Sequence, residues 1–200
     1  MRRLKAARLG VLAVVVLMTA TVSAQATPLT SPAGTFISEG AELKAEAEST
    51  FTIEGTINIK CQKSILEGAV AAAGGASTTA NIPLSKFTLE ECGANTATVL
   101  KPGTLELHAT EGGNGTATWS GAEITVLTHN ILGTLHCIYT LEGTDIGTLT
   151  GSKTTGATAT LDIGTVPLVQ KSTDSGCGST QNLTGSYKVT GPDYLDVDNS

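Results

Sequence analysis

The sequence alternates between apolar and polar residues with a period of two over many short segments. Successive side chains of a β-strand point to opposite faces, so this alternation is typical of strands that bury one face and expose the other. One phase of the clearest segment reads Phe51, Ile53, Gly55, Ile57, Ile59 and Cys61, with polar residues between them. The pattern returns at 43–48, 105–110, 134–141, 157–163 and 183–189.

Such strands, separated by turns rich in glycine and proline, indicate an all-β chain. The turn signals lie at 101–103, 112–115, 143–145 and 176–178. The best helix candidate, residues 66–73, has no strong cap and ends at two glycines, so we expect at most a short helix or a loop there. We predict an antiparallel β-sandwich, loosely immunoglobulin-like, with a β-barrel as the alternative.

The chain of 200 residues has the length of one large domain or two small ones. We expect a single domain over residues 41–198, and the alternative is two small sandwiches split near 100–103. Trp119 is the sole tryptophan and a candidate anchor of the core.

Residues 1–24 have the composition of a secretory signal peptide. A basic start is followed by an apolar run from Leu9 to Met18 and a small-residue pattern ending at Ala24. The run is shorter than the roughly 20 residues that span a bilayer, so we expect no stable membrane span after cleavage. Cleavage is expected after Ala24, with Ala26 as the alternative, and residues 25–40 are expected to form a flexible lead-in.

Removal of the signal changes the charge of the chain. The formal charge is −6, but four of the twelve basic residues lie in the first ten positions, so eight lysines then face eighteen acids, a charge of −10. No arginine remains, and arginine is the residue best suited to gripping phosphate, so we expect no nucleic-acid partner. Near the C-terminus, Asp193, Asp196 and Asp198 lack the other ligands of a calcium loop and are expected to form a solvated tail.

The four cysteines, Cys61, Cys92, Cys137 and Cys177, all follow the signal. An even count in an exported chain indicates two disulfides, and the absence of a Cys-x-x-Cys pair argues against zinc and thioredoxin-like chemistry.

Three disulfide connectivities are possible. We prefer Cys61–Cys92 and Cys137–Cys177, because Leu-Glu-Gly follows the first cysteine of each pair, at 66–68 and 141–143. Cys92 falls out of the strand phase set by Phe87 and Leu89, which predicts a bulge or a strand end at Glu91.

Support for catalysis is weak. The chain has no nucleophile elbow, no His-Glu-x-x-His motif and no phosphate loop. His108 and His136 fall on polar phases and His129 on an expected turn, so we predict no metal site, no cofactor and no enzyme. A hydrolase remains the third possibility, since carboxylates from distant segments can face each other across a cleft.

Two resemblances concern the mature chain. The Arg-free composition, Cys137-Ile138-Tyr139 and the closing segments 183–189 and 195–197 resemble small exported β-proteins of high-GC bacteria, over most of residues 40–198. More distantly, the chain is similar to the neocarzinostatin type of secreted apoprotein, which is acidic, poor in arginine and held by two disulfides. That resemblance implies a cleft for a small hydrophobic chromophore, and neither resemblance assigns a functional residue.

These observations favour a secreted, non-enzymatic structural or binding module at the cell surface or in the medium. They leave its partner open between a cell-surface component and a small apolar ligand. The alternative is a carrier of a small apolar ligand. A carrier needs a continuous apolar cavity of roughly 300 Å³ or more, which is a property of the folded chain.

Overall fold

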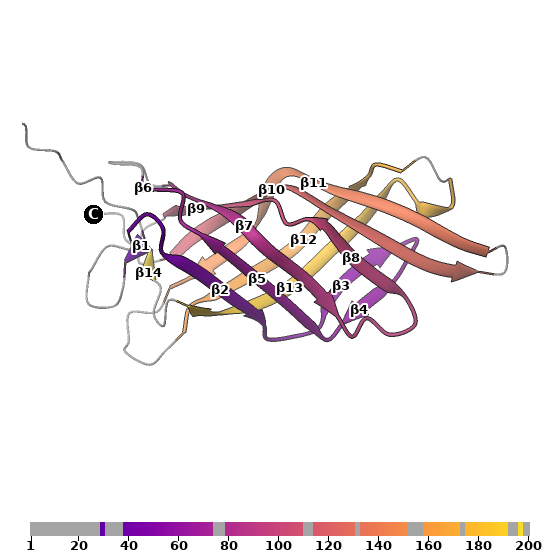
Figure 1. The fold of residues 1–200 in the computed structure, drawn as a ribbon, viewed down its shortest axis with the longest axis horizontal. Coiled ribbons are helices and arrows are strands. Elements are labelled where there is room, and N and C mark those ends of the chain that lie inside the picture. The colour runs from indigo at the N-terminus through magenta and orange to yellow at the C-terminus, as the bar shows by residue number, and fades with distance from the viewer. Residues whose placement is uncertain are drawn as a thin grey trace, which may run out of the picture.

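The computed structural model describes residues 29–30, 38–73, 79–109, 114–130, 133–151, 158–172, 175–191 and 196–197. Nearly all of them lie in antiparallel strands (Figure 1). Within these ranges the one helical element is the single turn η1 (Ser175–Cys177). The predicted signal peptide lies outside the described residues. None of the described helical segments has the length and apolar character needed to cross a membrane.

Eight strands close into a barrel (Figure 1). They are β2 (Glu42–Ala47), β5 (Lys63–Ala69), β7 (Thr79–Glu90), β9 (Thr104–Ala109), β10 (Asn114–Asn130), β11 (Gly133–Thr150), β12 (Thr160–Gln170) and β13 (Thr180–Gly191). Each pairs with its neighbour in the order β2, β5, β7, β9, β10, β11, β12 and β13, and β13 pairs back onto β2.

The predicted all-β class is therefore confirmed, in the form of the barrel that was the alternative. The preferred immunoglobulin-like sandwich is wrong, because a sandwich keeps two sheets with free edges. Here β13 has β12 on one side and β2 on the other, and that double pairing leaves neither β12 nor β2 as a free outer edge.

Shorter strands extend this barrel. They are β3 (Phe51–Gly55), β4 (Ile59–Cys61), β6 (Ala72–Ala73) and β8 (Thr96–Lys101). Strand β3 pairs with the first half of β13 and with β4, whereas β8 pairs with the second half of β10 and β6 with β7.

The two ends of the described chain pair with each other. β1 (Leu29–Thr30) and β14 (Asp196–Val197) form a separate two-stranded sheet, with Leu29 opposite Val197. Part of the expected flexible lead-in and part of the expected solvated tail thus form regular backbone hydrogen bonds. Residues 38–40 of the lead-in are also described, and the remaining residues of both segments lie outside the described residues.

Two local expectations are wrong. Residues 66–73 form most of β5 and all of β6, because Leu66, Gly68 and Val70 continue the inward phase of a strand that pairs with β2. The expected turn at 143–145 is a bend inside β11, since Thr144 and Asp145 remain paired with β10.

A line of bends crosses the barrel wall. Residues 102–103, between β8 and β9, lie opposite a register shift of β10 at 120–123. The line continues through β11 at 141–146 and β12 at 164–165, and reaches the break between β2 and β3 at 48–50. Bulges bend a strand and increase its twist, which is how a long sheet curves enough to close.

A chain of aromatic rings crosses the interior. Trp119 of β10 lies 4.8 Å from Phe87 of β7, Phe87 lies 5.9 Å from Phe51 of β3, and Phe51 lies 6.0 Å from Tyr187 of β13, all between ring centroids. The rings belong to a single hydrophobic cluster that runs from Leu43 to Val189. Trp119, the predicted core anchor, is fully buried within it.

Both ends of this aromatic chain are hydrogen-bonded. The indole Nε1 of Trp119 donates to the carbonyl of Pro102 at 2.9 Å. The hydroxyl of Tyr187 lies 2.6 Å from Ser64 Oγ, which itself donates to the carbonyl of Thr88 at 2.8 Å. Burial raises the pKa of Tyr187 well above its usual value, so this hydroxyl stays neutral and donates to Ser64.

Gly103 lies in the line of bends, where its backbone closely approaches the backbone of β10. Its φ is +79°, and a Cβ would lie 2.6 Å from the nitrogen of Ala122, whereas Gly93 has a similar φ of +74° with nothing within 4 Å. Gly93→Ala is expected to cost about 1 kcal/mol through backbone strain alone. Gly103→Ala is expected to cost about 2 kcal/mol more because the backbone must also shift. Urea unfolding of the two variants measures the difference, and equal midpoints would contradict the close approach.

Candidate functional site

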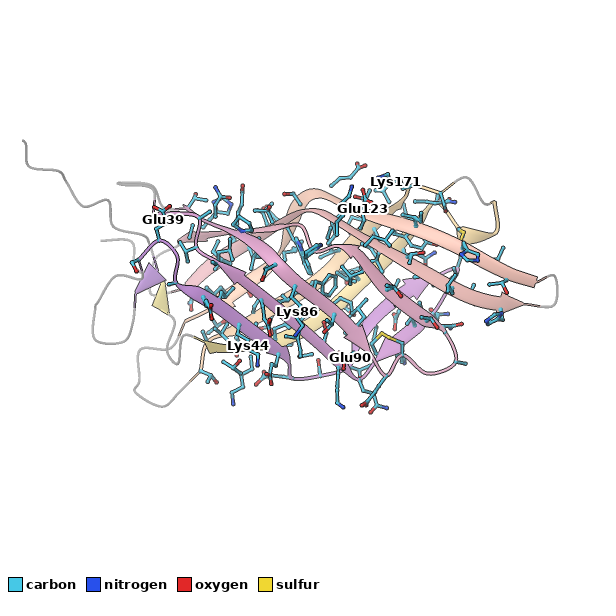
Figure 2. All side chains as sticks on the ribbon, viewed as in Figure 1. Glu39, Lys44, Lys86, Glu90, Glu123 and Lys171 are labelled. Carbon is cyan, nitrogen blue, oxygen red and sulfur yellow. A yellow bond between two sulfur atoms is a disulfide. The ribbon has the colours of Figure 1, made fainter. Side chains whose placement is uncertain are left out.

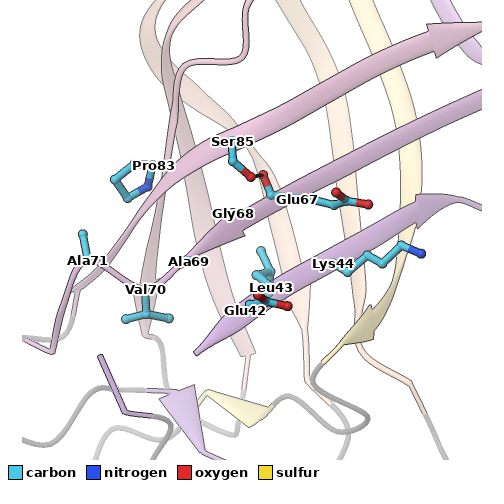
Figure 3. A pocket seen from close by; sticks show the side chains of 10 residues that line it. All are labelled: Glu42, Leu43, Lys44, Glu67, Gly68, Ala69, Val70, Ala71, Pro83 and Ser85. Atoms are coloured by element: carbon cyan, nitrogen blue, oxygen red, sulfur yellow. Dashed lines mark hydrogen bonds between the residues drawn. The ribbon is translucent and has the colours of Figure 1, made fainter. Parts of the chain in front are cut away.

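A hollow of about 530 Å³ lies on the outer wall where β2, β5 and β7 meet (Figure 3). It forms where the ladder between β5 and β7 is interrupted. The two strands pair as far as Gly68, opposite Leu84, and pairing resumes only in β6 at Ala72, opposite Asn81.

Pro83 accounts for the interruption. Successive backbone N–H groups of a strand point to opposite sides, and the N–H of Leu84 donates to the carbonyl of Gly103 on the side of β9. The nitrogen of Pro83 therefore faces β5, where it has no hydrogen to donate. Val70 turns instead toward the segment before β2, where its N–H donates to Ala41 and its carbonyl accepts from Gly40.

The strands come very close at the border of the hollow. A Cβ on Gly68 would lie 2.7 Å from the carbonyl oxygen of Pro83, so the approach requires glycine. One residue further, a bulge displaces Ser85, whose hydroxyl donates to the carbonyl of Glu67 at 3.2 Å. The hydroxyl of Ser85 thus provides a hydrogen-bond donor for the Glu67 carbonyl at the point where the ladder is irregular.

The hollow is lined by both apolar and polar residues. The apolar ones include Leu43, Val70 and Pro83, and the polar side of the lining, called the rim here, consists of Glu42, Lys44, Glu67 and Ser85. Such a surface can bind a group that is partly apolar and partly polar.

Salt bridges organise the rim. The Nζ atom of Lys44 lies 2.8 Å from Glu46, and the Nζ atom of Lys86 lies 3.4 Å from Glu67. The hydrogen bond and charge of Glu46, with a smaller contribution from Glu67, raise the pKa of Lys44. Lys44 therefore stays charged, and the rim is suited to binding by charge and hydrogen bonds.

A second polar cluster lies across β7, β9, β10 and β11. The Nδ1 atom of His108 is 2.9 Å from Thr79 Oγ1, and its Nε2 atom is 3.4 Å from Thr118 Oγ1 and 4.0 Å from Glu106 Oε2. The hydroxyl of Thr118 donates to Asp145 at 3.2 Å. Two hydroxyls, an imidazole and two carboxylates thus meet on the outer face, a grouping that the sequence analysis missed.

The direction of these hydrogen bonds argues against an activated nucleophile. A general base must accept the proton of the attacking hydroxyl. Here the proton of Thr118 points to Asp145, so Nε2–H of His108 donates to the oxygen of Thr118. We therefore interpret the cluster as a surface hydrogen-bond network that links neighbouring strands.

Glu123 forms the third charged cluster. Its carboxylate accepts from Lys171, which is labelled beside it in Figure 2. It also accepts from Lys101 at 2.8 Å, and the Glu123 side chain is only 13% exposed. The hydrogen bonds from Lys101 and then Lys171 lower the pKa of Glu123. The cluster attaches the end of β8 and the segment after β12 to β10, which is a structural role.

The predicted site residues are the four cysteines. The structure joins Cys61 to Cys92 and Cys137 to Cys177, the pairs preferred from the sequence. Three of the four are fully buried, whereas Cys92 is half-buried beyond the end of β7. The neighbouring Glu91 has a φ of 56° and follows the end of β7, in agreement with the predicted strand end there.

The disulfide at Cys177 lies in a buried polar network. Tyr139 and Gln181 both donate to the carbonyl of Cys177, the latter at 3.1 Å, and the Gln181 carbonyl accepts from the N–H of Ile57 at 3.3 Å. Burial is the main cause that raises the pKa of Tyr139. These bonds fix η1 against the barrel.

The histidines do not converge. His129 is exposed at the end of β10, where its Nδ1 lies 3.0 Å from Thr134 Oγ1, and His136 is exposed on β11. Within the described ranges, no three His, Cys, Asp or Glu side chains are grouped as metal ligands.

Comparisons with family models, with curated proteins and with solved structures find no match to this chain. The hollow, the His108 cluster and the Glu123 cluster are therefore the observations from which a function is inferred.

The His108 cluster yields a test of the hydrolase interpretation. A fluorophosphonate probe, which labels activated hydroxyl nucleophiles, is expected to leave Thr118 unmodified because its proton is directed at Asp145. Intact-mass spectrometry measures the label, and a known serine hydrolase serves as the positive control. A single adduct that disappears in His108→Ala would contradict this expectation.

Proposed function

We propose that the protein is an exported, non-enzymatic binding module that contacts its partner through the outer wall of the barrel. The observation that carries this proposal is the aromatic chain from Trp119 to Tyr187, whose buried rings fill the part of the barrel interior that they cross. Small barrels that hold a ligand leave such interior space open. Recognition is therefore assigned to the outside, and the hollow is a shaped part of the outer wall among the described residues.

Export is supported by two independent features. Residues 1–24 have the composition of a secretory signal, and disulfides persist in oxidising compartments. The two disulfides of the structure are compatible with such an environment. The partner of this module is a component of the cell surface, bound at the hollow.

A carrier of a small apolar ligand is the second candidate. The hollow exceeds the roughly 300 Å³ that such a ligand needs, and its lining includes the apolar residues Leu43, Val70 and Pro83. Against it stands the position of the hollow, which lies on the outer wall with a charged rim, whereas a carrier usually buries most of its ligand.

Native mass spectrometry distinguishes these two candidates. The full chain is expressed with its own leader in a bacterial host and purified from the exported fraction. The surface module is expected as a mature chain with two disulfides and no added mass. A small molecule that is released on denaturation would favour the carrier, and retention of the unprocessed chain inside the cell would contradict export.

Binding at the hollow is tested with a bulky substitution. Ala69 and Ala94 are both exposed, but Ala69 lines the hollow and Ala94 lies in the 91–95 loop. Ala69→Trp is expected to weaken sedimentation of the protein with cells of its own producing organism about tenfold, or ~1.4 kcal/mol. Ala94→Trp is expected to leave it unchanged. Equal binding by both variants, or no sedimentation of the wild-type protein, would contradict the proposal.

A further inference from the structure

Two consecutive strands lie beside each other without pairing. The second half of β7 pairs with β5, where Glu90 lies opposite Lys63, and β8 pairs with β10, where Thr98 lies opposite Thr125. Within the described chain no ladder of hydrogen bonds joins β7 to β8. The boundary between the two strands ends at residue 84, where the N–H of Leu84 donates to the Gly103 carbonyl. We call the boundary between 84–90 and 96–101 the seam (Figure 1).

The seam covers the middle of the aromatic chain. Phe87 and Leu89 of β7 and Ala97 of β8 point inward, and their exposed fractions are 5%, 9% and 6%. Phe87 packs directly on Trp119, which is 0% exposed. Separation of β7 from β8 would therefore give water access to Trp119.

The 91–95 loop closes the near end of the seam. Cys92 is bonded to Cys61 of β4, the carboxylate of Glu91 is paired with Lys63, and the Asn95 amide donates to the Asn58 carbonyl at 3.2 Å. The ion pair is well exposed on both sides, so it contributes little. The disulfide is the covalent link between the loop and β4.

The loop is held in a strained conformation. Among the described residues, Glu91 is the only non-glycine residue with a positive φ, at 56°. Residues other than glycine avoid this region, and such strain persists only where the surroundings impose it. Once Cys92 is released, non-covalent bonds remain, among them the one that the N–H of Gln62 donates to the Glu91 carbonyl at 3.3 Å. Such bonds exchange with water, so Glu91 can return to a common conformation and the loop can move away from β4.

The two disulfides differ in their accessibility. Cys61, Cys137 and Cys177 are 0% exposed, whereas Cys92 is half-buried beside the strained loop. Thiol–disulfide exchange requires a thiolate to reach a sulfur, so an external reductant reaches the first disulfide before the second.

We propose that the Cys61–Cys92 disulfide is a redox-operated latch that holds the seam closed. A thiolate of an external dithiol attacks Cys92 Sγ, the disulfide bond breaks, and Cys61 leaves as a thiolate that takes a proton from water. The second thiol of the reductant then displaces Cys92, which leaves as a thiol, and the dithiol is oxidised to its disulfide. Reduction thereby exposes Phe87 and the unpaired edges of β7 and β8, independently of the hollow.

Partial reduction of the wild-type protein tests the order of events. The protein is titrated with dithiothreitol, quenched with iodoacetamide and mapped by peptide mass spectrometry. Cys61 and Cys92 are expected to be alkylated while Cys137 and Cys177 remain bonded. Acrylamide quenching of the single tryptophan, Trp119, is expected to increase at least about twofold at that stage, since quenching follows solvent access. Simultaneous reduction of both disulfides would overturn the latch.

Matched double variants test the opening itself. The double variant Cys61→Ser with Cys92→Ser is expected to keep the far-UV circular dichroism spectrum of the wild type. Acrylamide is expected to quench its Trp119 fluorescence as strongly as in the partly reduced protein. Cys137→Ser with Cys177→Ser is the control and is expected to leave Trp119 shielded. Shielding of Trp119 in both variants would refute the proposal. If the first variant fails to fold, quenching of the partly reduced wild type decides the question.

Discussion

The double pairing of β13 is the constraint on which the rest of the structure depends. Its second half lies between β12 and β2, and its first half lies between β12 and β3. The N–H of Val189 also donates to the carbonyl of Ala159, just before β12, at 2.8 Å. Without this strand, β2 and β12 would present free edges and the aromatic chain would lose Tyr187. Because β13 joins strands from opposite ends of the sequence, the chain closes through contacts of long sequence separation, which are slow to form.

Both candidate functional features arise where this closed wall is irregular. The hollow follows from Pro83, whose nitrogen cannot donate to β5, and the seam ends at Gly103, beside Pro102. At the hollow a proline interrupts a ladder that would otherwise continue, and at the end of the seam a close backbone approach at Gly103 does so. The irregularities that let the wall curve are thus also the places where it offers a shaped or separable surface.

The alternation of residues predicts much of the local structure and little of its assembly. It correctly identifies the inward phase of Phe51, Leu105 and Tyr139, and it places Glu91 at the end of a strand. It cannot distinguish a sandwich from a barrel. A period of two indicates which face of a strand is buried, but it does not indicate which strands are neighbours. Residues 66–73 were misjudged because small apolar residues conceal the alternation of β5 and β6.

The candidate sites were less accessible to sequence reasoning than the strands. The His108 cluster depends on the registers of β9, β10 and β11, which bring Asp145 beside Thr118. The sequence offered one signal for this cluster. Glu106 and His108 share the polar face of one predicted strand, and Thr116 and Thr118 share one face of another segment. The hollow depends on which side of β7 the nitrogen of Pro83 faces, and that side is fixed only by the neighbours of β7.

The pairing of Leu29 with Val197 has a consequence for the topology of the whole chain. Because β1 and β14 are hydrogen-bonded partners, residues 29 and 197 lie only about one strand spacing apart, and the chain between them follows a nearly closed loop. The order of the strands along the chain is then almost cyclic, and the starting point of the polypeptide is not dictated by the architecture. A covalent bond across β1 and β14 would convert the protein into a ring, which could be cut at another exposed hairpin and still contain every strand pair of the barrel.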